Sequence, residues 1–122
     1  MNILKFTAKK AYASKDDDCY MVGFADDEYD YTHYVLLQRA FMFDEQDTAL
    51  DMDGEYIEID GQENSGYKQV ESALFDKEHF ILNIKSDNKI NRVAVDLSQT
   101  EMDEVQMTKF LLEILPDKVH FL

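Results

Sequence analysis

The stretch Glu55-Tyr56-Ile57-Glu58-Ile59-Asp60 alternates strictly between polar or aromatic residues and isoleucine. Since successive side chains of a strand point to opposite faces, this period of two predicts a β-strand whose Ile57 and Ile59 point to the core. Tyr56 and Glu58 then share the opposite face. This is the clearest strand signal in the chain, and the rest of the fold is worked out from it.

Segments on both sides of this strand show alternation, β-branched content or short uncharged apolar runs, which predict further strands. These segments are residues 3–13, 19–25, 33–43, 67–75, 79–85, 92–97 and a short final stretch at 119–122. We expect one long strand at 33–43, buried on much of both faces, with a helix as the alternative. Residues 44–53 are acidic and irregular, with room for one helical turn. The polar stretch 61–66 is bracketed by glycines and predicts an exposed loop that tolerates insertion.

The period changes after residue 97. Ser98 and Glu101 have the spacing of a capping box, in which each side chain bonds to the backbone amide of the other residue. We therefore expect a helix from Ser98 to about Leu115, ended by Pro116 because proline disfavours helical geometry in the residue before it. Its last turn, 110–115, is apolar nearly all round, so we expect it to pack on one face of the sheet.

These elements predict an α+β fold: an antiparallel sheet or meander of about six to seven strands with one C-terminal helix packed on it. With 122 residues, 45% of them hydrophobic, and only 4 Gly and 1 Pro, the chain has the size and composition of one folded domain, 1–122. Its apolar runs fall far short of the roughly 20 residues needed to cross a bilayer. The N-terminal residues do not resemble a secretion signal, which favours a cytoplasmic location and no membrane partner.

The charge of the chain is concentrated in one part of the sequence. Residues 14–63 contain sixteen acidic and two basic residues, which gives −14, while the other 72 residues contain ten of each. Nucleic acid and anionic lipid are therefore poor partners, because they bind basic surfaces. A basic protein is the partner that this charge favours, although an acidic surface that serves only solubility is the alternative.

The sequence predicts no catalytic residue, metal site or cofactor. None of the three histidines, His33, His79 and His120, lies at ligand spacing from another ligand type, and the glycines cannot form a phosphate-binding loop. The single cysteine, Cys19, lies in a predicted strand, where we expect a buried and inert thiol. Carboxylates are so numerous that the proximity of two would carry little information.

Acidic residues alternate with tyrosines between residues 26 and 34. Tyrosine is enriched at the energetic centres of protein interfaces, so this segment predicts a contact loop, joined by the acidic run at 44–47. In the alternative, Tyr29, Tyr31 and Tyr34 only begin the next strand and pack on the sheet. The predicted partner-binding residues are Asp26, Asp27, Glu28, Tyr29, Asp30, Tyr31, Asp44, Glu45 and Asp47.

Several ordered blocks of the chain resemble the immunity protein 10 family of bacterial polymorphic toxin systems. They are VGFADDEYD (22–30), YVLLQR (34–39), DEQD (44–47), MDGEYIE (52–58) and QENSGY (62–67), and the resemblance covers roughly residues 3 to 85. It implies a cytoplasmic antidote that binds a cognate toxin and blocks it, with no catalytic residues to transfer.

Three functions follow as hypotheses. The leading one is an inhibitory binding module, an immunity protein that meets a basic toxin through an acidic, tyrosine-containing surface. The second is an acidic, non-enzymatic adaptor or regulatory protein-binding domain, and the third is a small hydrolase that uses carboxylates. A toxin gene immediately upstream would favour the first, and a solitary housekeeping position would favour the second.

Overall fold

The computed structural model describes residues 2–85 and 88–121. In chain order the elements are β1 (Ile3–Thr7), β2 (Lys10–Lys15), β3 (Cys19–Ala25), β4 (Tyr34–Ala40), α1 (Glu45–Ala49), β5 (Tyr56–Ile59), the 3₁₀ turn η1 (Gln62–Asn64), β6 (Ser65–Tyr67), β7 (Val70–Phe75), β8 (His79–Ile84), β9 (Arg92–Asp96), α2 (Glu104–Ile114) and β10 (Val119–Phe121).

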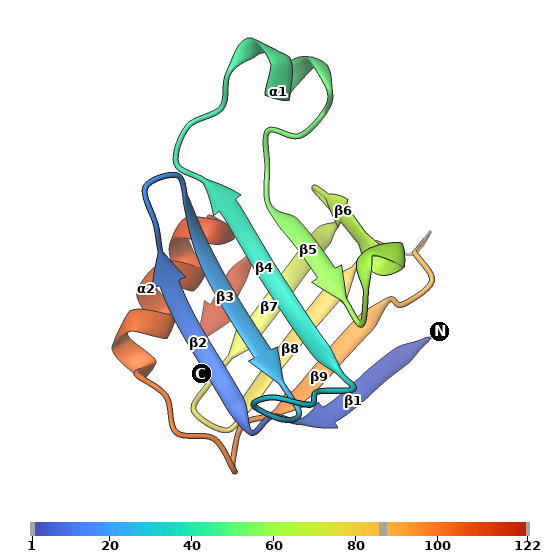
Figure 1. Cartoon of the computed structure of the whole chain (residues 1–122), viewed down its shortest axis with the longest axis vertical. Coiled ribbons are helices and arrows are strands. Elements are labelled where there is room, and N and C mark those ends of the chain that lie inside the picture. The colour runs from blue at the N-terminus through green and yellow to red at the C-terminus, as the bar shows by residue number, and fades with distance from the viewer. Residues whose placement is uncertain (1, 86–87, 122) are drawn as a thin grey trace.

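The strands form two sheets. Sheet A has the order β1-β9-β8-β7-β10 and sheet B the order β2-β3-β4-β5-β6. In Figure 1, sheet B lies in front, the strands of sheet A cross behind it, and α2 lies beside them. The α+β class is confirmed, but the single sheet of six to seven strands is wrong. The described residues form two sheets of five strands and two α-helices, and the pairs β1–β9 and β7–β10 are parallel.

The predicted strand 3–13 is divided at Ala8 and Lys9, where the chain passes from one sheet to the other. The amide of Ala8 donates to the carbonyl of Asp96 in sheet A at 2.9 Å. The amide of Lys9 donates to the carbonyl of Ala25 in sheet B, also at 2.9 Å. Strands that turn such corners are typical of sheets that pack across one another. One segment thus forms an edge of both sheets, which is why alternation alone did not reveal the break.

The core lies between the sheets. The rings of Phe24 in β3 and Phe80 in β8, both buried, lie 4.8 Å apart between centroids and join the two layers. Ile57 and Ile59 are buried, as predicted from the alternation. Residues 33–43 are not buried on both faces, however, because β4 alternates buried and half-buried residues and only one of its faces meets sheet A.

Helix α2 begins at Glu104, six residues later than predicted, with Asp103 as the N-cap whose side chain accepts from the amide of Gln106 at 3.1 Å. The preceding segment is held against the sheets, since Leu97 is buried and the Thr100 hydroxyl donates to the carbonyl of Ala8. These contacts keep residues 97–102 out of helical geometry, so Ser98 does not cap the helix. The apolar side of α2 packs on β2, β3 and β4, on the core side of sheet B, as expected for a buried last turn.

One charged residue is buried among those described. Glu55, immediately before β5, is only 3% exposed, and its Oε1 lies 3.0 Å from Nζ of Lys118. The same ammonium donates to the carbonyl of Val70 at 3.0 Å. A buried carboxylate needs such a partner because ionised groups lose their hydration on burial. The pair links the start of β5 in sheet B to the segment that precedes β10 in sheet A.

The stretch 61–66 is only partly the loop that the sequence predicts. Residues 62–64 form η1, but Ser65 and Gly66 pair with Glu58 and Ile57 as the beginning of β6. The ring of Tyr67, which follows them, packs on that of Tyr56 with 5.2 Å between centroids. The prediction of a loop is therefore wrong for residues 65 and 66, which form the edge strand of sheet B.

Replacing Lys118 with Met should lower the free energy of unfolding by about 2–4 kcal/mol, because it leaves the buried Glu55 carboxylate without its cation. Urea unfolding followed by circular dichroism measures this change. Lys77→Met, at an exposed lysine in the β7–β8 turn, is the control and should change stability by less than about 0.5 kcal/mol. Equal stability of the two variants would show that the ion pair does not support the fold.

Two glycines inserted after Glu63 should leave the fold intact, since Gln62 and Glu63 are exposed, and should lower Tm by less than about 3 °C. The same insertion between Ser65 and Gly66 should lower Tm by about 6–10 °C, because it breaks the pairing of β6 with β5. Thermal unfolding of both variants measures the difference. Similar Tm values for the two would contradict the assignment of β6 as a stabilising strand.

Candidate functional site

The outer face of sheet B, opposite the core, is rich in tyrosine. No element of the described chain lies in front of it in Figure 1. The strand register places Tyr12, Gly23, Leu36 and Glu58 in one row across β2, β3, β4 and β5. A second row consists of Met21, Gln38, Tyr56 and Tyr67. Half-buried aromatic side chains on an uncovered sheet face are available to a partner.

Gly23 makes room for the ring of Tyr12. A Cβ atom at position 23 would lie 2.3 Å from Cζ of Tyr12, so only glycine lets the phenol lie flat over β3. Burial raises the pKa of Tyr12, with smaller contributions from Tyr31 and from the negative charge of Glu58. The Tyr12 phenol therefore stays neutral at physiological pH.

Glu58 is held at the centre of this face by two phenols. The Tyr34 hydroxyl donates to Oε2 at 2.5 Å, and the Tyr56 hydroxyl donates to Oε1 at 2.8 Å. Burial raises the pKa of Tyr34, and the hydrogen bond to Glu58 raises it further, so this phenol remains a donor. The alternation of residues 55–60 predicted that Tyr56 and Glu58 share a face. The contribution of Tyr34 depends on the pairing of β4 with β5, which no sequence pattern specified.

The acidic loop 26–32 lies at one end of this face, and two of its acids stabilise the loop itself. Asp26 accepts the amide of Thr32 at 2.9 Å, and Asp27 accepts the amides of Tyr29 and Asp30 at 3.1 and 2.9 Å. The bonds from Asp30 and Tyr29 lower the pKa of the Asp27 carboxyl. These two carboxylates therefore form the loop in addition to contributing charge.

The other predicted residues of this loop are exposed. Tyr29 is 86% exposed and Tyr31 53%, although the Tyr31 ring also packs edge-on against Tyr34 with 5.2 Å between centroids. Glu28 is exposed and lies 3.8 Å from Nζ of Lys10. The alternative, in which the tyrosines pack on the sheet, thus describes Tyr34 and in part Tyr31, but not Tyr29.

The predicted acids of residues 44–47 lie at the other end of β4. Asp44 and Asp47 form the capping box of α1, in which Asp44 Oδ1 accepts the amide of Asp47 at 2.8 Å and Asp47 Oδ2 accepts that of Asp44 at 3.1 Å. Glu45 is exposed beside them. The predicted site residues therefore form two groups, at opposite ends of one strand, with the tyrosine face between them.

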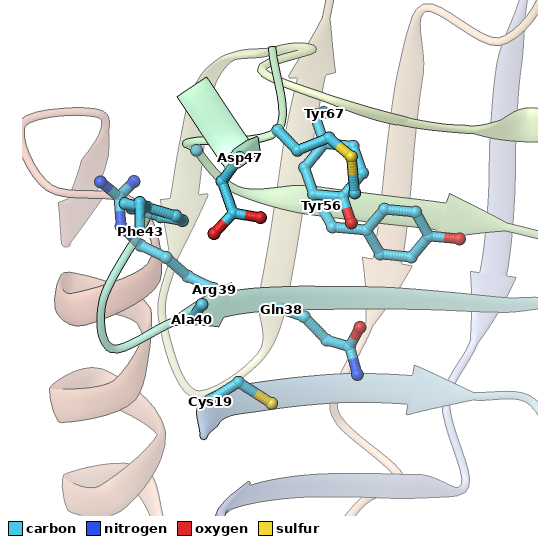
Figure 2. A pocket seen from close by; sticks show the side chains of 10 residues that line it. Cys19, Gln38, Arg39, Ala40, Phe43, Asp47, Tyr56 and Tyr67 are labelled. Carbon is cyan, nitrogen blue, oxygen red and sulfur yellow. The ribbon is translucent and has the colours of Figure 1, made fainter. Parts of the chain in front are cut away.

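A cavity of about 160 Å³ opens at the α1 end of the face, lined among others by Cys19, Gln38, Asp47, Tyr56 and Tyr67. Figure 2 shows Asp47 pointing from α1 toward β4, with Gln38 on β4 and Cys19 on the neighbouring β3. Cys19 is half-buried and not fully buried as predicted. Burial raises the pKa of its thiol, and the nearby Asp16 carboxylate raises it further, so the thiol is not activated as a nucleophile.

A second cavity, of about 190 Å³, opens at the other end of the face. Its walls include Tyr12, Tyr31, Tyr34, Leu36 and Glu58. We call it the Glu58 pocket. Asp27 and Glu28 also line it, and together with Tyr31 they are the lining residues that the sequence predicted. Tyr12, Tyr34, Leu36 and Glu58 were not predicted, because strand pairing brings them together from segments far apart in the chain.

The described residues contain no group of three His, Cys, Asp or Glu side chains placed to hold a metal ion. Among the same residues, no helix has the length and hydropathy needed to span a membrane. The outer face of sheet B is distinguished by its phenols, its carboxylates and its exposure, which suit contact with another molecule.

Comparison with known proteins supplies the family. A search of curated proteins gives no match. A family model described as Immunity protein 10 matches residues 7–106, which run from the end of β1 into α2 and include all of sheet B. This match covers most of the chain, and it confirms the resemblance found in the blocks of the sequence. The chain belongs to the immunity protein 10 family.

Proposed function

We propose that this chain binds and neutralises the cognate toxin of a bacterial polymorphic toxin system, in the cytoplasm, through the acidic, tyrosine-containing side of sheet B. The family is one of immunity proteins, which supports the role of toxin antidote. The action needs no catalytic residue, metal or cofactor, because a bound antidote blocks its target by occupying it.

One observation carries the proposed surface: the segment that holds all of the net charge also builds the centre of sheet B. Residues 14–63, with a net charge of −14, contain β3, β4, α1 and β5 and the loops that join them. Sheet A comes almost entirely from the parts of the chain where acids and bases balance. The charge is thus asymmetric in space, and its field attracts a basic partner to one side of the molecule.

The loop 26–32 carries both acidic residues, which contribute to this field, and tyrosines that serve as anchoring side chains. Tyr29 and Tyr31 project from a turn that hydrogen bonds hold in place, so binding would order few additional groups. Pre-formed loops and rigid aromatic side chains lose little conformational freedom on association, which favours affinity. The proposed contact residues are those of the sequence analysis, with Asp26, Asp27, Asp44 and Asp47 also shaping the two contact segments.

The charge predicts a strong effect of salt on association. Raising salt from tens of millimolar to half molar should slow association with the toxin by about ten- to a hundredfold as the Debye length shrinks, and dissociation should change less. Stopped-flow or surface-based kinetics with inactivated toxin measure both rates. An association rate that does not depend on salt would contradict a role for the acidic surface.

Reversing Glu28 and Asp30 to Lys should weaken this salt dependence and abolish the protection of cells that express the toxin. These carboxylates are exposed and accept no backbone amide from the described residues, so the loop should keep its shape. Glu71→Lys with Glu78→Lys, on sheet A, makes the same change in net charge away from the face and is the control. Full protection by both double variants would place the interface elsewhere on the chain.

Replacing Tyr29 or Tyr31 with Ala should weaken toxin binding by about 2 kcal/mol or more, if the ring is buried in the complex. Asp17→Asn, in the exposed β2–β3 turn, should change binding by well under 1 kcal/mol because a peripheral charge contributes only to the field. Isothermal titration with inactivated toxin measures the three affinities, and thermal unfolding checks the fold. Equal, small losses for all three variants would contradict anchoring by this loop.

A further inference from the structure

The Glu58 carboxylate has hydrogen-bond donors but no cation. Tyr34 and Tyr56 donate to its two oxygens, and no Lys, Arg or His of the described chain forms an ion pair with it. A carboxylate can accept about four hydrogen bonds, so one acceptor position on each oxygen remains. Such a pair of positions matches the two parallel N–H donors of a guanidinium group.

The walls of the Glu58 pocket are aromatic. Tyr12 lies over Gly23 at the opposite end of the row from Glu58, and Tyr34 and Tyr31 pack against each other at the loop end. A flat cation that approaches the carboxylate would lie against phenol rings, whose faces are negatively polarised. The apolar side chain of Leu36 also lines the pocket and suits the methylene stem of a long basic side chain.

The charge of the pocket favours a cation. Three acids, Asp27, Glu28 and Glu58, line it against one base, Lys10, and that base lies 3.8 Å from Glu28. Lys9 also acts on Asp27, but Glu58 forms no ion pair with any described side chain. A cationic group from a partner would therefore gain attraction here, in a half-buried site where water screens charges less than in bulk solvent.

We propose that the Glu58 pocket receives an arginine side chain of the bound toxin, whose guanidinium pairs with the Glu58 carboxylate between the rings of Tyr12 and Tyr34. This inference rests on the proposed function, in that the toxin supplies the arginine. Arginine fits better than lysine because its planar group can satisfy both carboxylate oxygens and stack on a ring at once. The pocket would then be the central anchor, and the acidic loop would contribute the attractive field at its rim.

The first test measures binding of inactivated cognate toxin to Glu58→Gln. This variant keeps the shape of the side chain and one oxygen for the phenols but removes the charge, and we expect binding about thirtyfold or more weaker. Glu63→Gln, an exposed glutamate in η1, is the matched control and should bind within about twofold of the native chain. Native affinity in Glu58→Gln would overturn the inference.

A second variant tests the aromatic wall without touching the carboxylate. In Gly23→Ala the new Cβ cannot coexist with the Tyr12 ring in its present position, so the ring must shift from its place over β3. The backbone at Gly23 is ordinary strand geometry, which alanine adopts without strain. We expect toxin binding about five- to tenfold weaker with Tm nearly unchanged. Unchanged binding would show that Tyr12 is not part of the site.

The third test separates the pocket from the proposed function. N-acetyl-arginine amide is titrated into the isotopically labelled native chain, and the ring signals of Tyr34 and Tyr56 are followed by NMR. We expect saturable shifts that are absent in Glu58→Gln and at least about tenfold weaker binding of N-acetyl-lysine amide. No saturable shift in the native chain would overturn the guanidinium site.

The outcomes distinguish the two proposals. If Glu58→Gln binds toxin normally while the Glu28 and Asp30 reversal does not, the proposed function stands and the arginine anchor falls. If the native chain does not bind the toxin, the proposed function fails and the toxin is excluded as the source of the arginine. Saturable binding of N-acetyl-arginine amide in that case supports a guanidinium site that serves another basic protein.

Discussion

The contact between Phe24 and Phe80 is the constraint on which the rest of the structure depends. The two rings lie 4.8 Å apart and press one face of each sheet against the other. Burial of the two inner faces supplies most of the hydrophobic stabilisation. It also fixes the register of each strand, so the residues between the buried ones must point away from the core. Since side chains alternate along a strand, every phenol and carboxylate that is not in the core of sheet B must stand on its outer face. The composition of the candidate site follows from this alternation.

Local patterns predicted the elements better than their assembly. The strand at Ile57 and Ile59, the polar loop before β4 and the end of α2 at Pro116 were correct, because each depends on residues adjacent in sequence. The division of the first strand at Ala8 was not predictable, since it depends on pairing with strands β3 and β9. The start of α2 was misplaced for a similar reason. A local capping pattern at Ser98 competes with contacts that Leu97 and Thr100 make to the sheets, and those contacts determine the structure.

The candidate site shows the same division. Exposed acids and tyrosines in the loop 26–32 could be recognised from composition, and the structure shows them at the rim of the tyrosine face. The Glu58 pocket could not be recognised, because Tyr12, Tyr34 and Glu58 are brought together only by the register of β2, β3, β4 and β5. The sequence also does not distinguish a carboxylate that caps a turn, such as Asp27, from one that faces solvent only. Hydrogen-bond geometry separates these roles.

The parallel pairing of β1 with β9 has a consequence for the time at which the protein becomes active after synthesis. Ile3 pairs with Arg92, so β1 leaves the ribosome about 89 residues before its partner, an interval of about 5–18 s at usual elongation rates. The neighbouring strands β2, β3, β4 and β5 are complete much earlier and pair in chain order. The side of the molecule that carries the tyrosines can therefore form during translation, while the layer that supports it is finished last. This supporting layer is complete only when α2 and β10 have followed β9 out of the ribosome.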